Sequence, residues 1–507
     1  ALGLFTSKGC PGPQPAMNHI RGESSRTSDT PGVTLPPDDD RWEVWWAFNK
    51  FDFIRLHRVQ DAPYTGQGQL EETPEQRERR LAGVRATLRK DVIPALRSLT
   101  ASPDPNVRAH AAQALGKLRD QDGIDVMRPM LSDNSLDVRY STMLGLGIME
   151  SGMGSYMLLN IGDDTSAGRG LVGATGSLNR NYQGGALILA ALRGDRTSET
   201  LVISHIRNRG GHPELLTMAC EAAGLMRSSR AIRPLLDVAF DESLPQYVRS
   251  AGISARGRIG DPSVTPALVE LLDSGIEPRR AAAVALGYTA HGAELRVINR
   301  LGEVLRNESD APTRHFAAIT LGRIGGPDAR ARLLDAFQQP RRDMRPWLAL
   351  ALGICERSNP EGDIADLLMA RIANESNANT LGGYLIALGL TGSEKGIATL
   401  TESCRSRHVE TAAHAAMALG LTGQPTAEAT LREIIRTSGS PLLVRNAAFG
   451  LGILGDTSSI PDLVELIRTT NNPFVASFAA LGISLMGDAE AVGSLLHVIE
   501  RQGDRGA

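Results

Sequence analysis

Several features that mark catalytic or metal-binding proteins are missing from this sequence. Its four cysteines form no CxxC pair, and it contains no HExxH motif and no nucleophile elbow. No uninterrupted apolar run reaches about 18 residues, so we expect no membrane span. We interpret the cysteines as free and mostly buried thiols and expect no cofactor; they are Cys10, Cys220, Cys355 and Cys404.

An excess of positive charge is also missing, and the basic residues are of an unusual kind. The formal net charge is −3 and the isoelectric point is near 6.4, which disfavours a nucleic-acid footprint and a membrane-surface role. Only five basic residues are lysines, namely Lys8, Lys50, Lys90, Lys117 and Lys395. The others are arginines, whose forked donors suit buried contacts between structural units.

What the chain does contain is a repeat: an apolar run that ends in Leu-Gly or a close variant. The marker glycines are Gly116, Gly147, Gly224, Gly257, Gly287, Gly322, Gly353, Gly389, Gly420, Gly452 and Gly482. Successive markers are 30 to 36 residues apart, except for one gap of 77. A period near thirty without any strand signal predicts a stack of helical hairpins.

Each repeat is expected to have two helices. The first carries a proline near its start, where the missing N–H has no intrahelical partner, as with Pro94 and Pro461. The second is rich in alanine and carries the marker glycine, which costs about 1 kcal/mol relative to alanine within a helix. We therefore interpret eight markers as positions without room for a side chain: Gly116, Gly287, Gly322, Gly353, Gly389, Gly420, Gly452 and Gly482.

An arginine stands eight residues before several of the markers. The set is Arg108, Arg139, Arg249, Arg279, Arg314 and Arg345. We expect these side chains to form a structural ladder, bonded to carboxylates or helix-end carbonyls of neighbouring repeats. Asp104 and Asp310, each four residues before its arginine, are the suggested partners.

An early proline in the first helix, a Val-Arg-x-x-Ala opening and a late Leu-Gly together resemble HEAT repeats. The likeness covers about residues 80–500 and fits the short variety that is also seen in bilin-lyase-like proteins. It implies an all-α solenoid, a right-handed superhelix of about twelve two-helix repeats, with second helices along the concave face. The region 148–200 departs from the pattern.

The predicted organisation has three parts. Residues 1–40 form a disordered leader rich in Pro, Gly and Ser, residues 41–74 a Trp-rich capping helix and loop, and residues 75–507 the solenoid. A Gly-rich insertion at 151–185 interrupts the solenoid, and we expect an extended loop there that contacts a partner or has no role. Its GxGxxG pattern, at 168–173, lacks the preceding strand that a dinucleotide site needs.

Three of the four tryptophans lie close together at helical spacing. This segment either caps the apolar end of the first repeat or anchors a partner, as buried tryptophans often do. Trp347, six residues before Gly353, is either a lone aromatic on the expected concave face or part of the packing between repeats. The candidate partner-binding residues are Trp42, Trp45, Trp46, Trp347 and Phe316.

The function we expect is a non-catalytic scaffold or adaptor that presents its concave surface to protein partners. The alternatives are a bilin-lyase-like chromophore-handling enzyme, and nucleic-acid binding through inner-face arginines. A HEAT-like hydroxylase of the deoxyhypusine type is known for His-Glu dipeptides as iron ligands, and this sequence has none. His408 and His414 are six residues apart, on different faces of a helix. The leader and tryptophan segment also resemble exported bacterial repeat proteins, which implies a periplasmic or exported location.

Overall fold

The computed structural model describes residues 42–50, 82–83, 86, 88–149, 151–208, 211–290, 294–338, 340–358 and 363–487. The predicted leader, most of the segment 51–87 and the residues after 487 lie outside this part of the chain. All regular structure in the described residues is helical. They form two compact units: unit 1 contains those between Lys90 and Ala290, and unit 2 those of Asp38–Arg89 and His291–Ala507.

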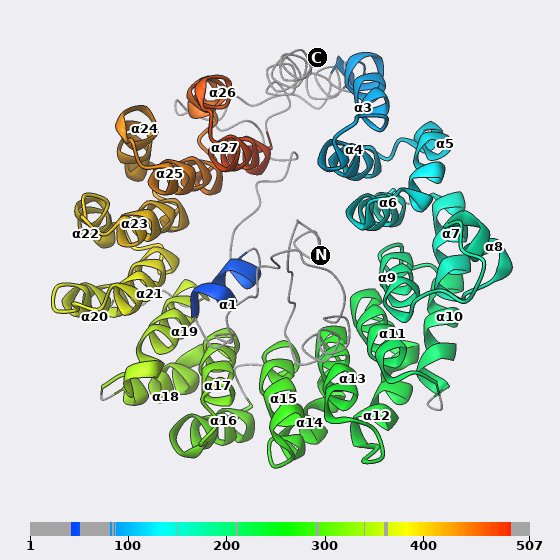
Figure 1. The fold of residues 1–507 in the computed structure, drawn as a ribbon. Coiled ribbons are helices and arrows are strands. Elements are labelled where there is room, and N and C mark those ends of the chain that lie inside the picture. Colours follow the sequence, from blue (N-terminus) through cyan, green and yellow to red (C-terminus); the bar gives the residue numbers. More distant parts are fainter. Residues whose placement is uncertain are drawn as a thin grey trace, which may run out of the picture. The chain divides into compact units, whose positions relative to one another are not determined.

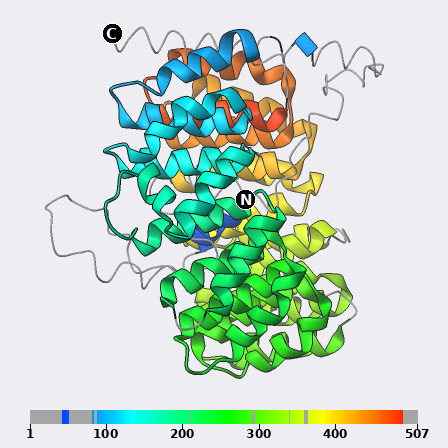
Figure 2. The ribbon, with the colours of Figure 1, turned by 90° about the vertical axis from the view of Figure 1, so that its right-hand side faces the viewer.

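Unit 1 is a two-layer stack of helical hairpins (Figures 1 and 2). The outer layer comprises α3 (Ile93–Leu99), α5 (Ile124–Met127), α7 (Gly152–Gly162), α8 (Ser166–Leu171), α10 (Arg196–Arg207), α12 (Ile232–Phe240) and α14 (Thr265–Leu271). The inner layer comprises α4 (Pro105–Lys117), α6 (Leu136–Ile148), α9 (Arg180–Ala191), α11 (Pro213–Met226), α13 (Gln246–Ile259) and α15 (Ile276–Thr289). A π-helical turn, η3 (Leu88–Val92), precedes α3.

Unit 2 repeats this design and adds one helix to it. Its outer layer comprises α16 (Leu295–Asn307), α18 (Gly326–Gln338), α20 (Asp363–Ile372), α22 (Ile397–Ser403), α24 (Glu428–Thr437) and α26 (Ile460–Thr469). Its inner layer comprises α17 (Ala311–Ile324), α19 (Arg345–Ser358), α21 (Ala378–Leu390), α23 (Val409–Thr422), α25 (Pro441–Leu454) and α27 (Pro473–Met486). The additional helix is α1 (Trp42–Asn49).

Local sequence signals explain where these helices begin and end. Inner helices start after side chains that accept a backbone N–H, such as Asn377 before α21, and several have proline in the first turn. Many hairpins also carry a short 3₁₀ turn before the outer helix, as at η11 (Thr457–Ser459). Gly455, with φ of +79°, ends α25 in the left-handed conformation that glycine adopts without strain.

Adjacent inner helices meet backbone to backbone at the marker glycines. A Cβ atom on Gly322, Gly353 or Gly389 would lie 2.5 to 2.6 Å from the carbonyl oxygen of an alanine in the next inner helix. On Gly116 and Gly420 it would lie 2.4 Å from the oxygen of a glycine there. No side chain fits at such distances, so the glycines allow the inner layer to close up.

The last two markers lie on the two sides of one such contact. A Cβ on Gly452 of α25 would lie 2.4 Å from Cα of Gly482 in α27. A Cβ on Gly482 would lie 2.5 Å from the carbonyl oxygen of Ala448, so both glycines serve the same contact between α25 and α27. Gly287 is half-buried near the C-terminal end of α15, the last inner helix of unit 1.

The Gly-rich segment 151–185 is not the expected extended loop. It forms α7, α8 and the first half of α9, and α9 takes a regular place in the inner layer between α6 and α11. Two of its glycines let backbones come close, since a Cβ on Gly154 would lie 2.9 Å from the carbonyl oxygen of Leu146 and one on Gly168 would lie 2.1 Å from that of Asn160. Within the GxGxxG pattern, Gly168 therefore serves the packing of α8 on α7, whereas a Cβ on Gly170 would meet nothing within 4 Å.

The ladder arginines all bond oxygen atoms at the end of an outer helix or in the next repeat. Arg108 donates to both carboxylate oxygens of Asp133 at 2.9 Å, and Arg314 donates to Asp343 at 2.8 Å. The remaining acceptors include Asp133 O for Arg139, Ala239 O for Arg249 (3.1 Å), Ser274 O for Arg279 (2.8 Å) and Glu375 for Arg345 (3.4 Å). Asp104 and Asp310, the partners suggested by spacing, cap the N-termini of α4 and α17.

Candidate functional site

Helix α1 lies on the inner layer of unit 2, more than 300 residues away in sequence from the helices that it contacts (Figure 1). Trp42 is 1% exposed and Trp46 is 3% exposed. One expected position for this segment is a cap over the first repeat. Helix α1 does not lie there, because its contacts are with α19, α21 and α23.

Trp42 occupies a hollow above α21 that exists because two consecutive residues there lack side chains. A Cβ on Gly382 would lie 3.0 Å from the Trp42 ring, and one on Gly383 would lie 3.5 Å from it. The indole Nε1 donates to the backbone oxygen of Asn379 at 3.0 Å and to its side-chain oxygen at 3.1 Å. On the α23 side, the His414 ring centroid lies 5.2 Å from that of Trp42.

Trp45 and Trp347 make the next contact along α1. Their ring centroids are 5.7 Å apart, and Trp347 in turn stacks on His315 of α17 at 4.5 Å with an interplanar angle of 9°. Trp347 is 2% exposed, so this candidate partner-binding residue is occupied by α1. Phe316, the neighbour of His315, is half-buried.

The C-terminal half of α1 contacts α23, and Lys50, the residue after α1, contacts α25 and α27. Trp46 Nε1 lies 3.3 Å from the sulfur of Met417, and Lys50 Nζ lies 5.0 Å from the ring centroid of Phe449 and 6.0 Å from that of Phe478. The receiving surface, which we call the α1-binding face, comprises Trp347, Asn379, Gly382, Gly383, His414, Met417, Phe449 and Phe478.

Burial shifts the pKa of two titratable groups at this contact. Burial lowers the pKa of His414 to about 4, and the nearby Glu410 only partly opposes this. Burial, reinforced by the charge of Arg445, lowers the pKa of Lys50 to about 8. Both positive charges therefore disfavour the docked state of α1.

Acidification is expected to release α1. Because the pKa of docked His414 lies below the ordinary value of 6.5, the stabilisation is complete above pH 6.5 and is lost as pH falls toward 4. Between these values docking should weaken by up to about tenfold per pH unit, the limit for one proton. All four tryptophans lie at this site, so a red shift of their emission between pH 7 and 4.5 measures the release.

The control for this experiment is His414→Phe, which keeps an aromatic ring beside Trp42 and removes the titrating group. Its emission should stay constant over the same pH range. An equal red shift in this variant would show that another group, rather than His414, links pH to docking.

Sequence reasoning found the tryptophans but missed most of the surface that receives them. The position six residues before each marker carries Phe316, Trp347, Gly383 and His414 in consecutive repeats of unit 2. Trp347, Gly383 and His414 of this series contact α1, and the glycine among them is the sequence signal for a hollow. No sequence pattern singled out the other residues of this contact, which are Asn379, Met417, Phe449, Phe478 and Lys50.

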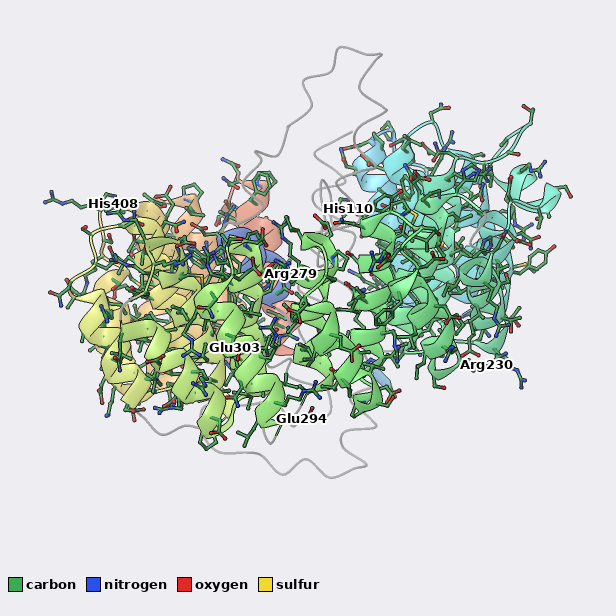
Figure 3. The ribbon with its side chains drawn as sticks, turned by 90° about the horizontal axis from the view of Figure 1, so that it is seen from below. His110, Arg230, Arg279, Glu294, Glu303 and His408 are labelled. Atoms are coloured by element: carbon green, nitrogen blue, oxygen red, sulfur yellow. The ribbon has the colours of Figure 1, made fainter. Side chains whose placement is uncertain are left out.

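The histidines of α23 do not form a metal centre. His408 is exposed at the N-cap of α23 and points away from the ribbon (Figure 3), whereas His414 is buried against Trp42. No group of three His, Cys, Asp or Glu side chains with metal-binding geometry occurs in the described residues. Three of the four cysteines, Cys220, Cys355 and Cys404, are free and buried, as expected; Cys10 lies outside the described residues.

Two hollows on the described outer layers are lined by paired charges. One in unit 2 includes Arg432 and Arg436, which both bond Asp462. One in unit 1 includes Arg230, bonded to Glu199 at 2.8 Å. Among the described helices, none is both long and apolar enough to cross a membrane.

Two layers of helical hairpins, repeated about every thirty residues, define the class of α-solenoid repeat proteins. A sequence profile of HEAT repeats matches residues 70–147, 199–287, 276–353 and 428–506, which together make up more than half of the chain. The chain therefore belongs to the HEAT-repeat family, as the sequence resemblance indicated. A search of curated proteins gave no match.

Solved structures with a similar arrangement include human deoxyhypusine hydroxylase in complex with glycerol. It is 21% identical, with 61% of this chain and 99% of that chain covered and a TM-score of 0.24. The Kap95:Nup1 complex is 14% identical, with 87% of this chain and 70% of that chain covered and a TM-score of 0.43. Both TM-scores are low, so neither likeness says what this chain binds or does.

Proposed function

We propose that this chain is a non-catalytic protein-binding scaffold, and that the inner layer of unit 2 is its binding surface. One observation carries the proposal: a tryptophan-bearing helix from a distant part of the sequence is seated on that surface. A face that buries two tryptophans almost completely offers the aromatic anchors and the hollow typical of helix-in-groove recognition.

The chemistry of the α1-binding face supports recognition rather than catalysis. Its polar atoms are those of Asn379, which accepts an indole N–H, and of His414, whose lowered pKa keeps the ring neutral at pH 7. The other members are aromatic, Met or Gly, which supply contact area and room. Such a surface selects the shape of a helix and the places of its aromatic side chains.

The experiment that tests this function uses the full chain with α1 detached from the face. The variant Trp42→Ala/Trp46→Ala removes two anchors without touching the stack, and it should retain proteins from a cell extract that the wild-type chain retains poorly. Adding Gly382→Leu fills the hollow vacated by Trp42 and should reduce retention at least fivefold. The readout is quantitative mass spectrometry of the retained proteins.

The matched control is Gly439→Leu, added to the same double variant. A Cβ at Gly439 would meet nothing within 4 Å, so this leucine should leave retention unchanged. Equal retention with and without Gly382→Leu, or no retention by the double variant, would contradict a binding role for this face.

A further inference from the structure

The far end of the α1-binding face holds two positive side chains close together. Lys50 Nζ lies over the rings of Phe449 and Phe478, and the Arg445 guanidinium lies 5.2 Å from the centroid of the same Phe478 ring. Arg445 Nε is buried and has no hydrogen-bond partner among the described residues. Burial lowers the pKa of Arg445, and no carboxylate of the described residues offsets this loss of hydration.

Helix α1 is therefore a poor electrostatic match for the surface that it occupies. Its other contacts are complementary, since an indole N–H meets Asn379 and the two buried rings meet glycine and methionine. Directly after α1, Lys50 brings its positive charge next to that of Arg445. An acidic side chain at that position would pair with Arg445 in a half-buried setting, where ion pairs are stronger than at the open surface.

The short length of α1 makes it replaceable. It has eight residues, and isolated helices below about 12 residues are marginal in water, so α1 depends on the face for its helical state. Trp42 and Trp46 are four residues apart and so lie on one side of this helix, and Lys50 follows four residues later, directly after Asn49, the last residue of α1. Any helix with the same spacing and a better third contact can compete for the same place.

We propose that the partner of this surface is a helical segment of another protein with two tryptophans four residues apart and a Glu or Asp four residues after the second. This inference rests on the proposed binding function. Helix α1 then acts as an internal competitor. It has tryptophans at the same spacing as the partner but is followed by a positive charge where the partner has a negative one, and it covers the face until the partner replaces it.

Two labelled peptides test the proposal by fluorescence anisotropy. One has the sequence of residues 41–50, and the other carries the single change Lys50→Glu. Both are titrated with the full chain bearing Trp42→Ala/Trp46→Ala, in which the face is open. The Lys50→Glu peptide should bind about tenfold more tightly, and both should bind the wild-type chain more weakly because α1 competes.

The variant Arg445→Gln identifies the group responsible. In the open chain with this change, the advantage of the Lys50→Glu peptide should fall to less than twofold, while the unchanged peptide should bind as well as before or better. A tenfold advantage that survives Arg445→Gln would overturn the assignment to this arginine. A Lys50→Glu peptide that binds no better than the unchanged one would overturn the acidic partner.

A second measurement does not depend on the folding of the variant Trp42→Ala/Trp46→Ala. Lys50→Glu placed in the otherwise wild-type chain should strengthen docking of α1, so the tryptophan emission should resist acidification to a lower pH. If neither peptide binds while the open chain still retains proteins through Gly382, the proposed function stands and the proposed partner is wrong.

Discussion

Replacing Gly420 with alanine is expected to lower the free energy of unfolding of unit 2 by about 3 kcal/mol, although alanine is the better helix former by about 1 kcal/mol. The new methyl carbon would lie 2.4 Å from the carbonyl oxygen of Gly450 and 2.5 Å from its Cα. Both are backbone atoms in the middle of a helix, so no side chain can turn away. Helices α23 and α25 must move apart, and the contacts along both are loosened.

Chemical denaturation of the full chain, followed by circular dichroism, measures this loss. The control is Gly439→Ala, which places the same methyl group in unit 2 where nothing lies within 4 Å. That variant should change the unfolding free energy by less than about 0.5 kcal/mol. A stability of Gly420→Ala equal to that of the control would show that the two backbones separate at little cost.

The repeat could be predicted from sequence because its cause is local and recurs. At Gly322, Gly353 and Gly389 the same short-range pattern places a glycine where the next inner helix supplies an alanine carbonyl, so one physical rule explains all three. Helix boundaries also follow from capping residues within a few positions of each end. The family and the all-α fold need no information beyond this pattern.

The segment 151–185 was misread because glycine has two opposite meanings. It marks loops where the backbone must turn, and it marks helices where another backbone comes close. Gly154 and Gly168 belong to the second kind: a Cβ on the first would meet Leu146 O, and one on the second would meet Asn160 O. Composition alone cannot separate the two meanings, since the deciding atoms belong to another helix.

The place of α1 could not be predicted for a related reason. Local spacing shows that Trp42 and Trp46 share a helix face, but the surface that buries them is assembled from residues more than 300 positions later. Each repeat contributes one or two side chains to that surface. Aligning the repeats at the position six before the marker shows Gly383 between Trp347 and His414, and this arrangement is visible only once the helices are stacked.

The second large effect is expected at Arg314, where replacement by methionine should lower the free energy of unfolding of unit 2 by about 3 kcal/mol. This side chain is 4% exposed and donates at 2.8 Å to the carbonyl oxygens of Glu308 and Ser309 and to Asp343. Methionine keeps the apolar stem and removes all three donors. The two carbonyls at the end of α16 then lose a charged partner that water cannot replace in the packed stack.

Arg345→Met is the matched comparison, because it removes the same ladder position one repeat further on in unit 2. Arg345 is more exposed and its bond to Glu375 is 3.4 Å long, so its loss should cost about 1 kcal/mol or less. Arg314→Lys should recover less than half of the loss at Arg314, since one ammonium group cannot reach both carbonyls and the carboxylate in the fixed geometry of a fork. The opposite result would be a lower denaturation midpoint for Arg345→Met than for Arg314→Met. It would mean that the ladder stabilises the stack through surface charge rather than through hydrogen bonds to the carbonyls that end the outer helices.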